Sequence, residues 1–433
     1  MLNTKLLGGV KVKHHKTTAH LPAEAMPIPD KVSIPMLQHL GPACEVKVQV
    51  GETVKVGQVI GDSTALFSAP IHASVSGTVT AIEDFTTSSG ATCKRVVITA
   101  DKQQELDPAI KKPEITDHKS FVAAIRASGL VGLGGAGFPT HVKLNPPDLS
   151  KIDTLLINGA ECEPYITADH RTALDDSQNL LDGVAAVQKY LGIAKAIIAI
   201  EDNKADAIEK LRGMTADNSA VEVKALPAIY PQGAEKVTIY QSTGRIIPEG
   251  KLPSDVGVVV LNITTISVLG QYLKDGIPLI TKTLTVDGGA IAKPKNVVAP
   301  IGASYKDVIA FCGGFSQEPG KILMGGPMMG IAIADEDLPV IKNNNALLVF
   351  DQKQAKGMEE TPCIRCGRCT RACPVLLMPA SMEGRFLNND VEGLKKLKAN
   401  LCIECGCCSY VCPAKRHLVA RHRQAKQLLK NMK

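Results

Sequence analysis

The sequence predicts a multidomain α/β protein with four folded parts: an N-terminal hybrid β-barrel, an α/β core, a β-grasp-like unit and a helical, cysteine-rich C-terminal domain. Three observations predict this division. Short β-type runs separated by turn residues fill positions 32–100, and helical and strand patterns alternate from position 116 to 272. Nine of the 13 cysteines fall between Cys363 and Cys412.

Length and composition agree with several globular domains. The chain has 433 residues, which is long for one compact core, and its 45% hydrophobic and 21% charged residues are typical of folded proteins. Trp is absent and aromatic residues make up 3%, which disfavours the stacking surfaces of single-stranded nucleic-acid binders. A net charge of +6 is modest for this length, so no nucleic-acid partner is indicated.

The N-terminal region shows no pattern of a secretion signal. Residues 1–16 are polar and basic, and the apolar runs at 196–200 and 256–263 are far shorter than the ~20 residues that cross a bilayer. A long chain that gathers its cysteines in one segment without a signal uses them for metal binding rather than for disulfides. We therefore expect a soluble chain in a reducing compartment.

Residues 1–31 are predicted to form an irregular arm and residues 32–112 a small barrel. The strand-like runs are residues 44–50, 54–60, 71–75, 77–82 and 95–99, with a turn at Gly51-Glu52. This pattern resembles the biotinyl/lipoyl-type hybrid barrel. A carrier version needs an attachment lysine on the exposed turn between its halves, where this chain has His72 and Ser74 nearby and no lysine. The barrel is therefore predicted to be a packing or docking module.

The α/β core is predicted for residues 113–275. Helices are expected at 117–128, 172–191, 205–212, 235–242 and 267–274, and strands at 153–158, 196–201, 221–226 and 256–262. Such alternation is typical of a largely parallel sheet. The β-grasp-like unit follows at residues 276–350, with strands at 280–286, near Val297 and at 321–324, and a helix at 305–311.

The cysteine-rich domain, residues 351–433, carries a repeated ligand pattern in which C-x2-C-x2-C-x3-C precedes a proline, at Pro374 and again at Pro413. This is the spacing of two [4Fe–4S] clusters of the bacterial ferredoxin type, in which three thiolates of one run bind one cluster and the fourth binds the other. The predicted ligand sets are Cys363, Cys366, Cys369 and Cys412 for one cluster, and Cys402, Cys405, Cys408 and Cys373 for the second.

A pair of zinc sites is the alternative, but zinc gives no reason for a duplicated run of this spacing. Helices are expected between the runs, at 379–387 and 391–399. Cys407 is interpreted as a buried neighbour of a cluster rather than a ligand.

Two further motifs lie in the α/β core. Residues 129–140 contain the spacing G-x-G-x-x-G at Gly132, Gly134 and Gly137, but they follow a helix, whereas a dinucleotide-binding fingerprint follows a strand. Glycines still let backbone N–H groups approach a phosphate, and Lys143 can supply a positive charge. Residues 158–165 begin at the carboxyl end of a predicted strand, where α/β sheets bind ligands. Alone, this second segment is equally well an acidic surface loop.

Together, the two motifs resemble the flavin- and NADH-binding subunit of respiratory NADH:quinone oxidoreductase, which has a similar G-x-G-G-A-G-F-P-T loop followed by an N-x-x-E-x-E-P loop. Residues 230–235 resemble its tyrosine–glycine–glutamate loop and residues 262–265 its asparagine–threonine turn. Ala160 and Ala234 depart from that family's aspartate and glutamate. With a barrel at the N-terminus and two clusters in place of one, nearly the whole chain resembles the C subunits of Rnf complexes, the ion-pumping ferredoxin:NAD⁺ oxidoreductases.

The resemblance implies three kinds of cofactor: two [4Fe–4S] clusters, a non-covalent FMN and NAD(H). It places Glu163 near the nicotinamide as the catalytic residue. The residues implied at the flavin phosphate and ribityl chain are Gly132, Gly134, Gly135, Gly137 and Lys143, and those around the rest of the flavin are Asn158, Glu161, Tyr230, Gly233, Glu235, Asn262 and Thr265.

The resemblance also implies a function, that of an NAD-dependent oxidoreductase subunit on the cytoplasmic face of the bacterial membrane. Electrons would pass between nicotinamide and ferredoxin-linked carriers, and integral and peripheral partner subunits, one of them ferredoxin-like, would couple this flow to ion transport. Two alternatives stay open. One is the cobalamin reductase of propanediol-type microcompartments, which shares this layout, and the other is an electron-wiring subunit with no active nucleotide site.

Two smaller patterns remain. Residues 89–92, Ser-Gly-Ala-Thr, match a short signal by which other subunits of such complexes attach FMN to threonine, but they are also ordinary turn residues, and we interpret them as a turn. Residues 415–433 carry seven Lys or Arg and no acid. They form either a solvated helix face or a docking surface for anionic lipid or an acidic partner.

Overall fold

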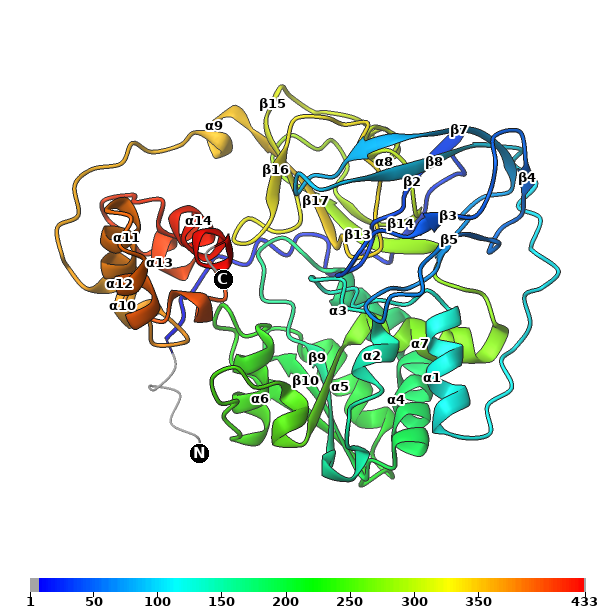
Figure 1. Cartoon of the computed structure of the whole chain (residues 1–433), viewed down its shortest axis with the longest axis horizontal. Helices are drawn as coiled ribbons and strands as arrows, with labels where there is room; N and C mark the ends of the chain where they lie inside the picture. The colour runs from blue at the N-terminus through cyan, green and yellow to red at the C-terminus, as the bar shows by residue number, and fades with distance from the viewer. Residues whose placement is uncertain (1–7, 432–433) are drawn as a thin grey trace.

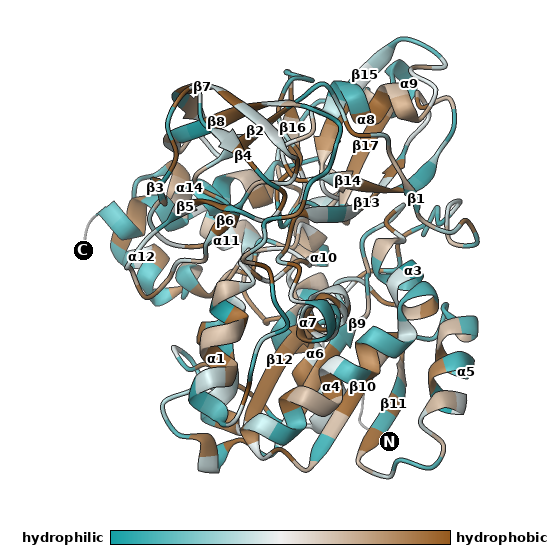
Figure 2. Cartoon of the chain, turned by 90° about the vertical axis from the view of Figure 1, so that its right-hand side faces the viewer, coloured by the Kyte–Doolittle hydropathy of each residue, from teal (hydrophilic) through white to brown (hydrophobic). Residues whose placement is uncertain are grey.

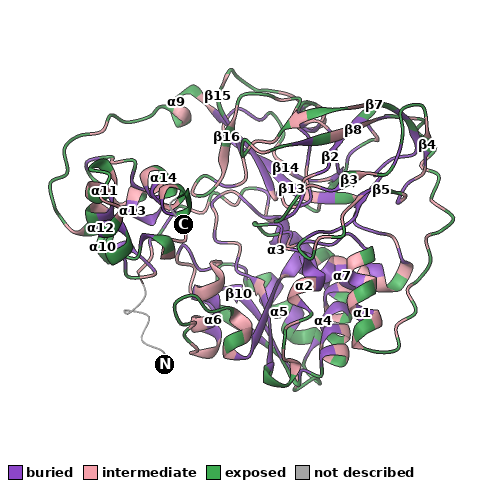
Figure 3. Cartoon of the chain, viewed as in Figure 1, coloured by how far each residue is buried: buried purple, intermediate pink, exposed green. Residues whose placement is uncertain are grey.

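The computed structural model describes residues 8–431, which fold into four packed parts (Figure 1). In that view the barrel and the β-grasp-like unit lie above the α/β core, and the cysteine-rich domain lies to one side. A long exposed segment after α9 (Gln352–Ala355) connects this domain to the β-grasp-like unit (Figure 3). Within residues 8–431 there is no helix with the length and apolar character needed to span a membrane.

The barrel consists of two small antiparallel sheets, with strand orders β2-β8-β7-β4 and β3-β5-β6. Its core is built from alternate residues of paired strands, as in the fully buried pairs Val32 with Ile98 and Ile34 with Val96. The strands are β2 (Lys31–Pro35), β3 (Glu45–Val46), β4 (Thr53–Val54), β5 (Val59–Asp62), β6 (Ile71–His72), β7 (Gly77–Thr86) and β8 (Thr92–Ala100).

The turn between the two halves of the barrel is buried, in agreement with a packing module. His72 and Ser74 are 3% and 1% exposed, and the Ser74 hydroxyl donates a hydrogen bond of 2.6 Å to the carbonyl oxygen of Ile301 in the β-grasp-like unit. At the other end of the barrel, residues 87–91 form the tight turn between β7 and β8, with Gly90 at φ 85°. Residues 89–91 of the Ser-Gly-Ala-Thr pattern therefore lie in this turn, and Thr92 is the first residue of β8.

A parallel sheet of order β11-β10-β9-β12 is the centre of the α/β core. Strands β9, β10 and β12 are buried on both faces, by α6 on one side and by α1, α4, α5 and α7 on the other, which explains their almost continuous apolar sequence (Figure 2). The edge strand β11 instead alternates buried and exposed residues. The elements are α1 (His118–Ala127), α2 (Thr140–Lys143), β9 (Thr154–Gly159), α3 (Ala168–Asp175), α4 (Ser177–Leu191), β10 (Lys195–Glu201), α5 (Ala205–Met214), β11 (Val221–Leu226), α6 (Glu235–Thr243), β12 (Val258–Asn262) and α7 (Ile263–Asp275).

The single helix predicted at 172–191 is wrong, because α3 and α4 break at Asp176. The start of α3 is held by the Glu161 carboxylate, which accepts a hydrogen bond of 2.6 Å from the backbone N–H of Asp169. The body of α4 instead packs so closely on α7 that any side chain at Gly270 would collide with the carbonyl of Asn179. The start of α3 and the body of α4 are thus held by different parts of the chain.

The β-grasp-like unit contains a six-stranded mixed sheet of order β1-β14-β13-β17-β15-β16, packed against one helix that occupies the predicted residues. Two of its strands, β16 and β17, were not predicted; β17 is the apolar run Ala-Leu-Leu-Val-Phe, which lacks alternation because it is buried. The elements are β13 (Thr281–Asp287), β14 (Lys295–Pro300), α8 (Tyr305–Phe311), β15 (Pro319–Met324), β16 (Ile331–Ile333) and β17 (Ala346–Asp351).

The N-terminal arm is more ordered than the irregular segment predicted for residues 1–31. Strand β1 (Glu24–Ala25) pairs in parallel with β14, and Val10 pairs with Tyr230 of the α/β core. These partners are far away in sequence, so no local periodicity predicts the pairings. Residues 1–7 of the predicted arm lie outside the described residues.

The cysteine-rich domain is a small helical unit in which each cysteine run forms a loop leading into a short helix. Its helix α11 occupies the predicted residues, whereas α12 ends before 399, because Lys398 adopts a positive φ of 54°. The helices are α10 (Arg368–Ala372), α11 (Pro379–Leu387), α12 (Val391–Lys396), α13 (Cys407–Tyr410) and α14 (Leu418–Asn431).

The basic C-terminal segment is largely neutralised by acids of its own domain. Arg421 pairs with both Glu360 and Glu383, and Arg416 also pairs with Glu383. Glu404 pairs with two further cations of α14, Arg423 and Lys426. Most of the charge that suggested a lipid-docking surface therefore stabilises the domain internally.

Candidate functional site

A cavity of about 400 Å³ lies at the carboxyl edge of the parallel sheet. Its volume is in the range of small-molecule sites, roughly 300–1,000 Å³. Because β9 and β12 are parallel neighbours, the motifs that follow them meet here, with Asn158 directly beside Asn262. The predicted residues that line the cavity are Gly134, Asn158, Glu161, Glu163, Tyr230, Gly233, Glu235 and Asn262.

The two asparagines tie the loops of the cavity together. The Asn158 side chain donates a hydrogen bond of 2.8 Å to the carbonyl oxygen of Gly233. Asn262 is the N-cap of α7, where its side-chain oxygen accepts from the backbone N–H of Thr265 at 3.1 Å. Its amide group donates to Asp169 at 2.7 Å, so strand β12 and helix α3 are fixed to each other at the cavity wall.

The glycine-rich loop meets the cavity through Gly134, where a Cβ atom would lie 2.6 Å from the Asn262 amide nitrogen. Its other glycines, Gly132, Gly135 and Gly137, are not among the cavity-lining residues. Neighbouring domains hold the loop from outside: the Asn343 amide donates to the carbonyl oxygen of Gly135 at 2.6 Å, and the backbone N–H of Leu40 donates to that of Gly137 at 3.0 Å.

Two more predicted contacts support the cavity without lining it. The Lys143 ammonium donates to the Glu235 carboxylate at 2.7 Å, and Glu235 itself lines the cavity. The buried hydroxyl of Thr265 accepts from the backbone N–H of Leu133 at 2.9 Å, so it shapes the glycine-rich loop. In this structure the Lys143 charge is therefore bound to a carboxylate rather than directed into the cavity.

The acidic loop, residues 161–166, places two carboxyl groups in the cavity. Burial raises the pKa of Glu161 to about 7, although Lys16 opposes this shift. Burial also raises the pKa of Glu163 to about 7. The Glu163 carboxylate accepts one hydrogen bond of 3.0 Å from the backbone N–H of Met328, and its other oxygen, Oε1, is buried with no partner in the described residues. Glu163 can therefore accept a further hydrogen bond from a ligand.

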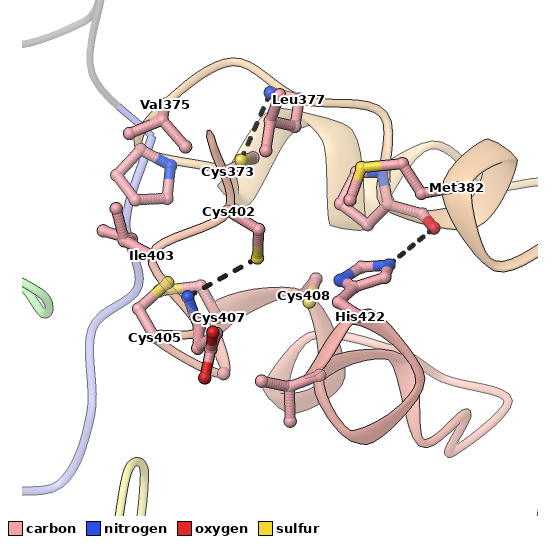
Figure 4. A pocket seen from close by; sticks show the side chains of 15 residues that line it. Cys373, Val375, Leu377, Met382, Cys402, Ile403, Cys405, Cys407, Cys408 and His422 are labelled. Carbon is pink, nitrogen blue, oxygen red and sulfur yellow. Dashed lines mark hydrogen bonds between the residues drawn. The ribbon is translucent and has the colours of Figure 1, made fainter. Parts of the chain in front are cut away.

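The cysteine-rich domain holds a small pocket next to this cavity. Figure 4 shows the side chains of Cys373, Cys402, Cys405 and Cys408 gathered around it, one from the first run and three from the second. The Cys373 sulfur accepts from the backbone N–H of Leu377 at 3.3 Å, and that of Cys402 from Glu404 at 3.4 Å. We call these four cysteines the inner set.

The other predicted ligands are Cys363, Cys366, Cys369 and Cys412, which we call the outer set. Cys363 and Cys366 are exposed, Cys412 is half-buried and Cys369 is buried. Cys407, which belongs to neither set, is fully buried beside the inner pocket.

One thin wall separates the cavity from the inner set. Ile403 and Cys405 line both spaces. The Tyr230 hydroxyl, on the cavity side, donates a hydrogen bond of 2.8 Å to the carbonyl oxygen of Cys405. A molecule in the cavity therefore lies next to a predicted cluster ligand.

These residues fit the cofactors that the sequence implies. The orphan carboxylate oxygen of Glu163, a close-packed glycine and a cavity of suitable size match a polar planar ligand such as FMN. Four thiols around one pocket, two of them with N–H···S hydrogen bonds, match a [4Fe–4S] cluster.

Comparison with protein families matches four segments of the chain. Residues 4–103 match the RnfC barrel sandwich hybrid domain, and residues 125–271 match the Nuo51 FMN-binding domain. Residues 283–332 match the SLBB domain and residues 362–416 a 4Fe-4S dicluster domain. The chain thus contains an FMN-binding domain and a dicluster domain, as the cofactor prediction requires.

Comparison with curated proteins decides the family. The chain is 45% identical, over 85% of its length and 81% of the relative, to the C subunit of the proton-translocating ferredoxin:NAD⁺ oxidoreductase complex of Clostridium ljungdahlii. It is 42% identical, over 97% of its length and 96% of the relative, to the C subunit of the Na⁺-translocating complex of Acetobacterium woodii. The chain belongs to this family of C subunits. The resemblance to those of Rnf complexes is therefore confirmed.

A more distant member of the family, the C subunit of the ion-translocating oxidoreductase complex of Rhodobacter capsulatus, is 38% identical over 90% of this chain and 76% of the relative. Among solved structures, a chain of an NAD⁺-reducing [NiFe]-hydrogenase matches with a TM-score of 0.53 and 18% identity. That match covers 72% of this chain and 63% of the other, and at this identity it shows a shared fold alone.

Sequence reasoning missed several residues of the site. Asp169, Ile403 and Met329 line the cavity, and Lys16 of the N-terminal arm holds the acidic loop. They come from α3, the second cysteine run, the β-grasp-like unit and the arm. In the sequence, the cavity is indicated only by the motifs that resemble those of the flavin- and NADH-binding subunit. None of these four residues belongs to those motifs.

Proposed function

We propose that this chain is the NAD(H)-reacting C subunit of an ion-translocating ferredoxin:NAD⁺ oxidoreductase complex. It passes electrons between nicotinamide and ferredoxin-linked carriers through FMN and two [4Fe–4S] clusters, and partner subunits couple this flow to ion transport. It lies at the cytoplasmic face of the membrane as a peripheral subunit. The observation that carries the proposal is the shared wall of Ile403 and Cys405 between the cavity and the inner set.

The cofactors supply the electron chemistry. When bound, FMN exchanges a two-electron hydride with NAD(H) and single electrons with the clusters. The residues of the chain bind and order these groups. The Gly134–Asn262 contact and the Tyr230 wall support placing the flavin in the cavity, and the free oxygen of Glu163 supports placing a hydrogen-bond donor of the nicotinamide beside it.

The exposure of the two cysteine sets supports an order of transfer. The inner set adjoins the cavity, and the outer set reaches the surface through Cys363 and Cys366. Arg365 and Arg368 beside the outer set are exposed and form no ion pair with any carboxylate of residues 8–431. A ferredoxin-like, acidic partner suits such a surface, because opposite charges steer association.

Finer points of the architecture belong to the same proposal. A mixed sheet with a single packed helix supports a β-grasp-like fold for residues 276–350. The boundaries proposed at 112 and 275 fall between elements, whereas those at 31 and 350 each fall one residue inside a strand, because β2 begins at Lys31 and β17 ends at Asp351. The names of the relatives support the Rnf function over the cobalamin-reductase and wiring alternatives.

An anaerobic absorbance titration of the cluster-reconstituted, FMN-loaded protein with NADH tests the proposal. We expect about eight irons and one FMN per chain, with bleaching of the cluster absorbance by NADH. Eight irons with bound FMN but no bleaching would contradict a working nicotinamide site. Eight irons without FMN binding would leave the wiring alternative.

A further inference from the structure

The N-terminal arm contacts three segments around the site: the cysteine-rich domain, Tyr230 and the acidic loop. The backbone N–H of Gly9 donates to the carbonyl oxygen of Ala372 at 2.9 Å, one residue before the inner-set ligand Cys373. Val10 and Tyr230 then exchange two backbone hydrogen bonds, of 2.8 and 3.0 Å. The arm thus approaches the acidic loop already fixed to the cysteine-rich domain and to the wall of the cavity.

Lys16 is the residue by which the arm holds the acidic loop. Its ammonium donates to the carbonyl oxygens of Glu161 at 2.8 Å and Glu163 at 2.9 Å, and also to that of Ile166. An ammonium has three N–H donors, so all of them are used on this one loop. The side chain is 15% exposed, which means that these bonds form largely out of water.

The acidic loop needs such a partner. Two of its non-glycine residues have positive φ, Glu161 at 49° and Tyr165 at 70°, and such conformations persist only where the surroundings impose them. The three carbonyl oxygens converge on one point, where they repel one another unless a cation or donor lies between them. The preceding arm residues add support: the backbone N–H of Tyr165 donates to the His14 carbonyl oxygen at 2.8 Å, and its ring stacks on His15.

We propose that Lys16 is a positioning residue for the proposed nicotinamide site: by binding three carbonyls of the acidic loop, it keeps the Glu163 carboxyl group directed into the cavity. This inference rests on the proposed function for the role of Glu163. It gives the N-terminal arm a part in electron transfer, although the arm carries no flavin motif and no predicted cluster ligand. The Glu163 carboxylate is held in addition by a hydrogen bond from the backbone N–H of Met328.

The first experiment measures the order of the loop directly. Hydrogen–deuterium exchange is followed in peptides covering residues 160–170 of the cluster-loaded full-length protein, for Lys16→Met and for the control Lys13→Met, an exposed lysine of the same arm. We expect exchange at this segment to rise at least tenfold in Lys16→Met alone, with normal iron content. Unchanged exchange in Lys16→Met would overturn the proposal.

The second experiment tests whether Lys16 acts through Glu163. KM for NADH and kcat with ferricyanide are measured for Lys16→Met, Glu163→Gln and the double variant, together with the Kd of FMN by fluorescence. We expect KM to rise about tenfold in each single variant and little further in the double, with a smaller change in kcat, because coupled residues are not additive. Strictly additive effects would overturn the positioning role.

A third outcome separates the inference from the proposed function. If Glu163→Gln leaves KM and kcat unchanged, the nicotinamide assignment fails, and the exchange measurement alone decides whether Lys16 orders the loop. Lys16→Arg sharpens the test, since a planar guanidinium keeps the charge but cannot place three donors on one converging point. We expect Lys16→Arg to remain close to Lys16→Met in exchange.

Discussion

The two cysteine sets have the same sequence spacing but very different surroundings. The inner set lies around a small pocket, shares a wall with the cavity and receives backbone N–H···S hydrogen bonds. The outer set has two exposed cysteines beside exposed arginines. Since hydrogen bonds to sulfur and solvent exposure set cluster potentials, one repeated motif has been placed in two electrostatic settings. The fold, not the motif, therefore decides the surroundings of each predicted cluster.

The largest expected effect comes from removing one ligand of each set. Cys405→Ser should slow NADH-driven reduction of the outer cluster at least 100-fold, because the cluster next to the cavity loses a ligand. Cys363→Ser should leave NADH-driven reduction of the inner cluster intact. Electron paramagnetic resonance of NADH-treated samples and iron analysis measure both. Cys407→Ala, which changes a buried neighbour, is the control and should keep about eight irons. Equal losses of NADH-driven reduction in both serine variants would contradict different roles for the two cysteine sets.

The stability contributed by a carboxyl group of the cavity and by one near the outer set should depend on pH in opposite directions. The folded-state pKa of Glu163 is raised to about 7 by burial, so the folded protein binds a proton more tightly than the unfolded chain and loses stability as pH rises from about 4.5 to 7. This loss is about 3 kcal/mol, and Glu163→Gln should remove it. Thermal unfolding across this pH range, compared between the variant and the parent, measures the effect. Parallel curves for the two proteins would contradict it.

Near the outer set, the hydrogen bond from Arg421 lowers the pKa of Glu360 to about 2. Its contribution to stability is therefore complete above about pH 4.5 and is lost as pH falls towards 2. Glu360→Gln should show a smaller loss of stability on acidification than the parent protein. Acid titration followed by circular dichroism measures this, and a steeper acid transition in the variant would be the opposite result.

A smaller effect is expected from the charges beside the outer set. Changing Arg365 and Arg368 together to Gln should slow electron exchange with an acidic ferredoxin about tenfold at low salt, and should make the rate less dependent on salt. Reduction of the inner cluster by NADH should be unchanged. Stopped-flow absorbance at several salt concentrations measures both rates. A rate that keeps its salt dependence in the double variant would locate the docking surface elsewhere.

The smallest effect is expected at the wall of the cavity. Tyr230→Phe removes the hydrogen bond to the Cys405 carbonyl and leaves that buried oxygen without its partner, which costs about 1 kcal/mol of stability. We expect the inner cluster to keep its irons and to shift its potential slightly, with no shift at the outer cluster. A redox titration followed by electron paramagnetic resonance measures both potentials. A shift in the potential of the outer cluster alone would mean that the cluster next to Tyr230 is the outer one, and the inner and outer assignments would have to be exchanged.

Local patterns were enough to predict much of this molecule. The parallel sheet, the helix α8 and the cysteine loops follow from periodicity and spacing, which act over a few residues. Asn158 and Asn262 could be placed together because parallel strands end at the same edge. Glu161 and Glu163, which follow β9, line the cavity at this edge.

The remaining features depend on contacts between distant segments. Lys16 was not predicted as part of the site because a basic residue in a polar arm has no local signal, and its three partners lie about 150 residues further on. Ile403 is one of the two residues between Cys402 and Cys405, and no local pattern indicates that it lines the cavity. The break between α3 and α4 at Asp176 likewise has no signal in the helical pattern of that segment.

The position of the N-terminal arm also sets the order in which this protein matures. Residues 8–25 are synthesised long before their partners, which are Tyr230, β14 and finally Ala372. Closing such long loops costs conformational entropy, so these contacts form only after the later domains have folded. The arm then docks next to Cys373, one of the inner ligands. Until the arm has docked, the N-terminal segment is not held by the later domains, and chain ends in that state are preferred sites of proteolysis.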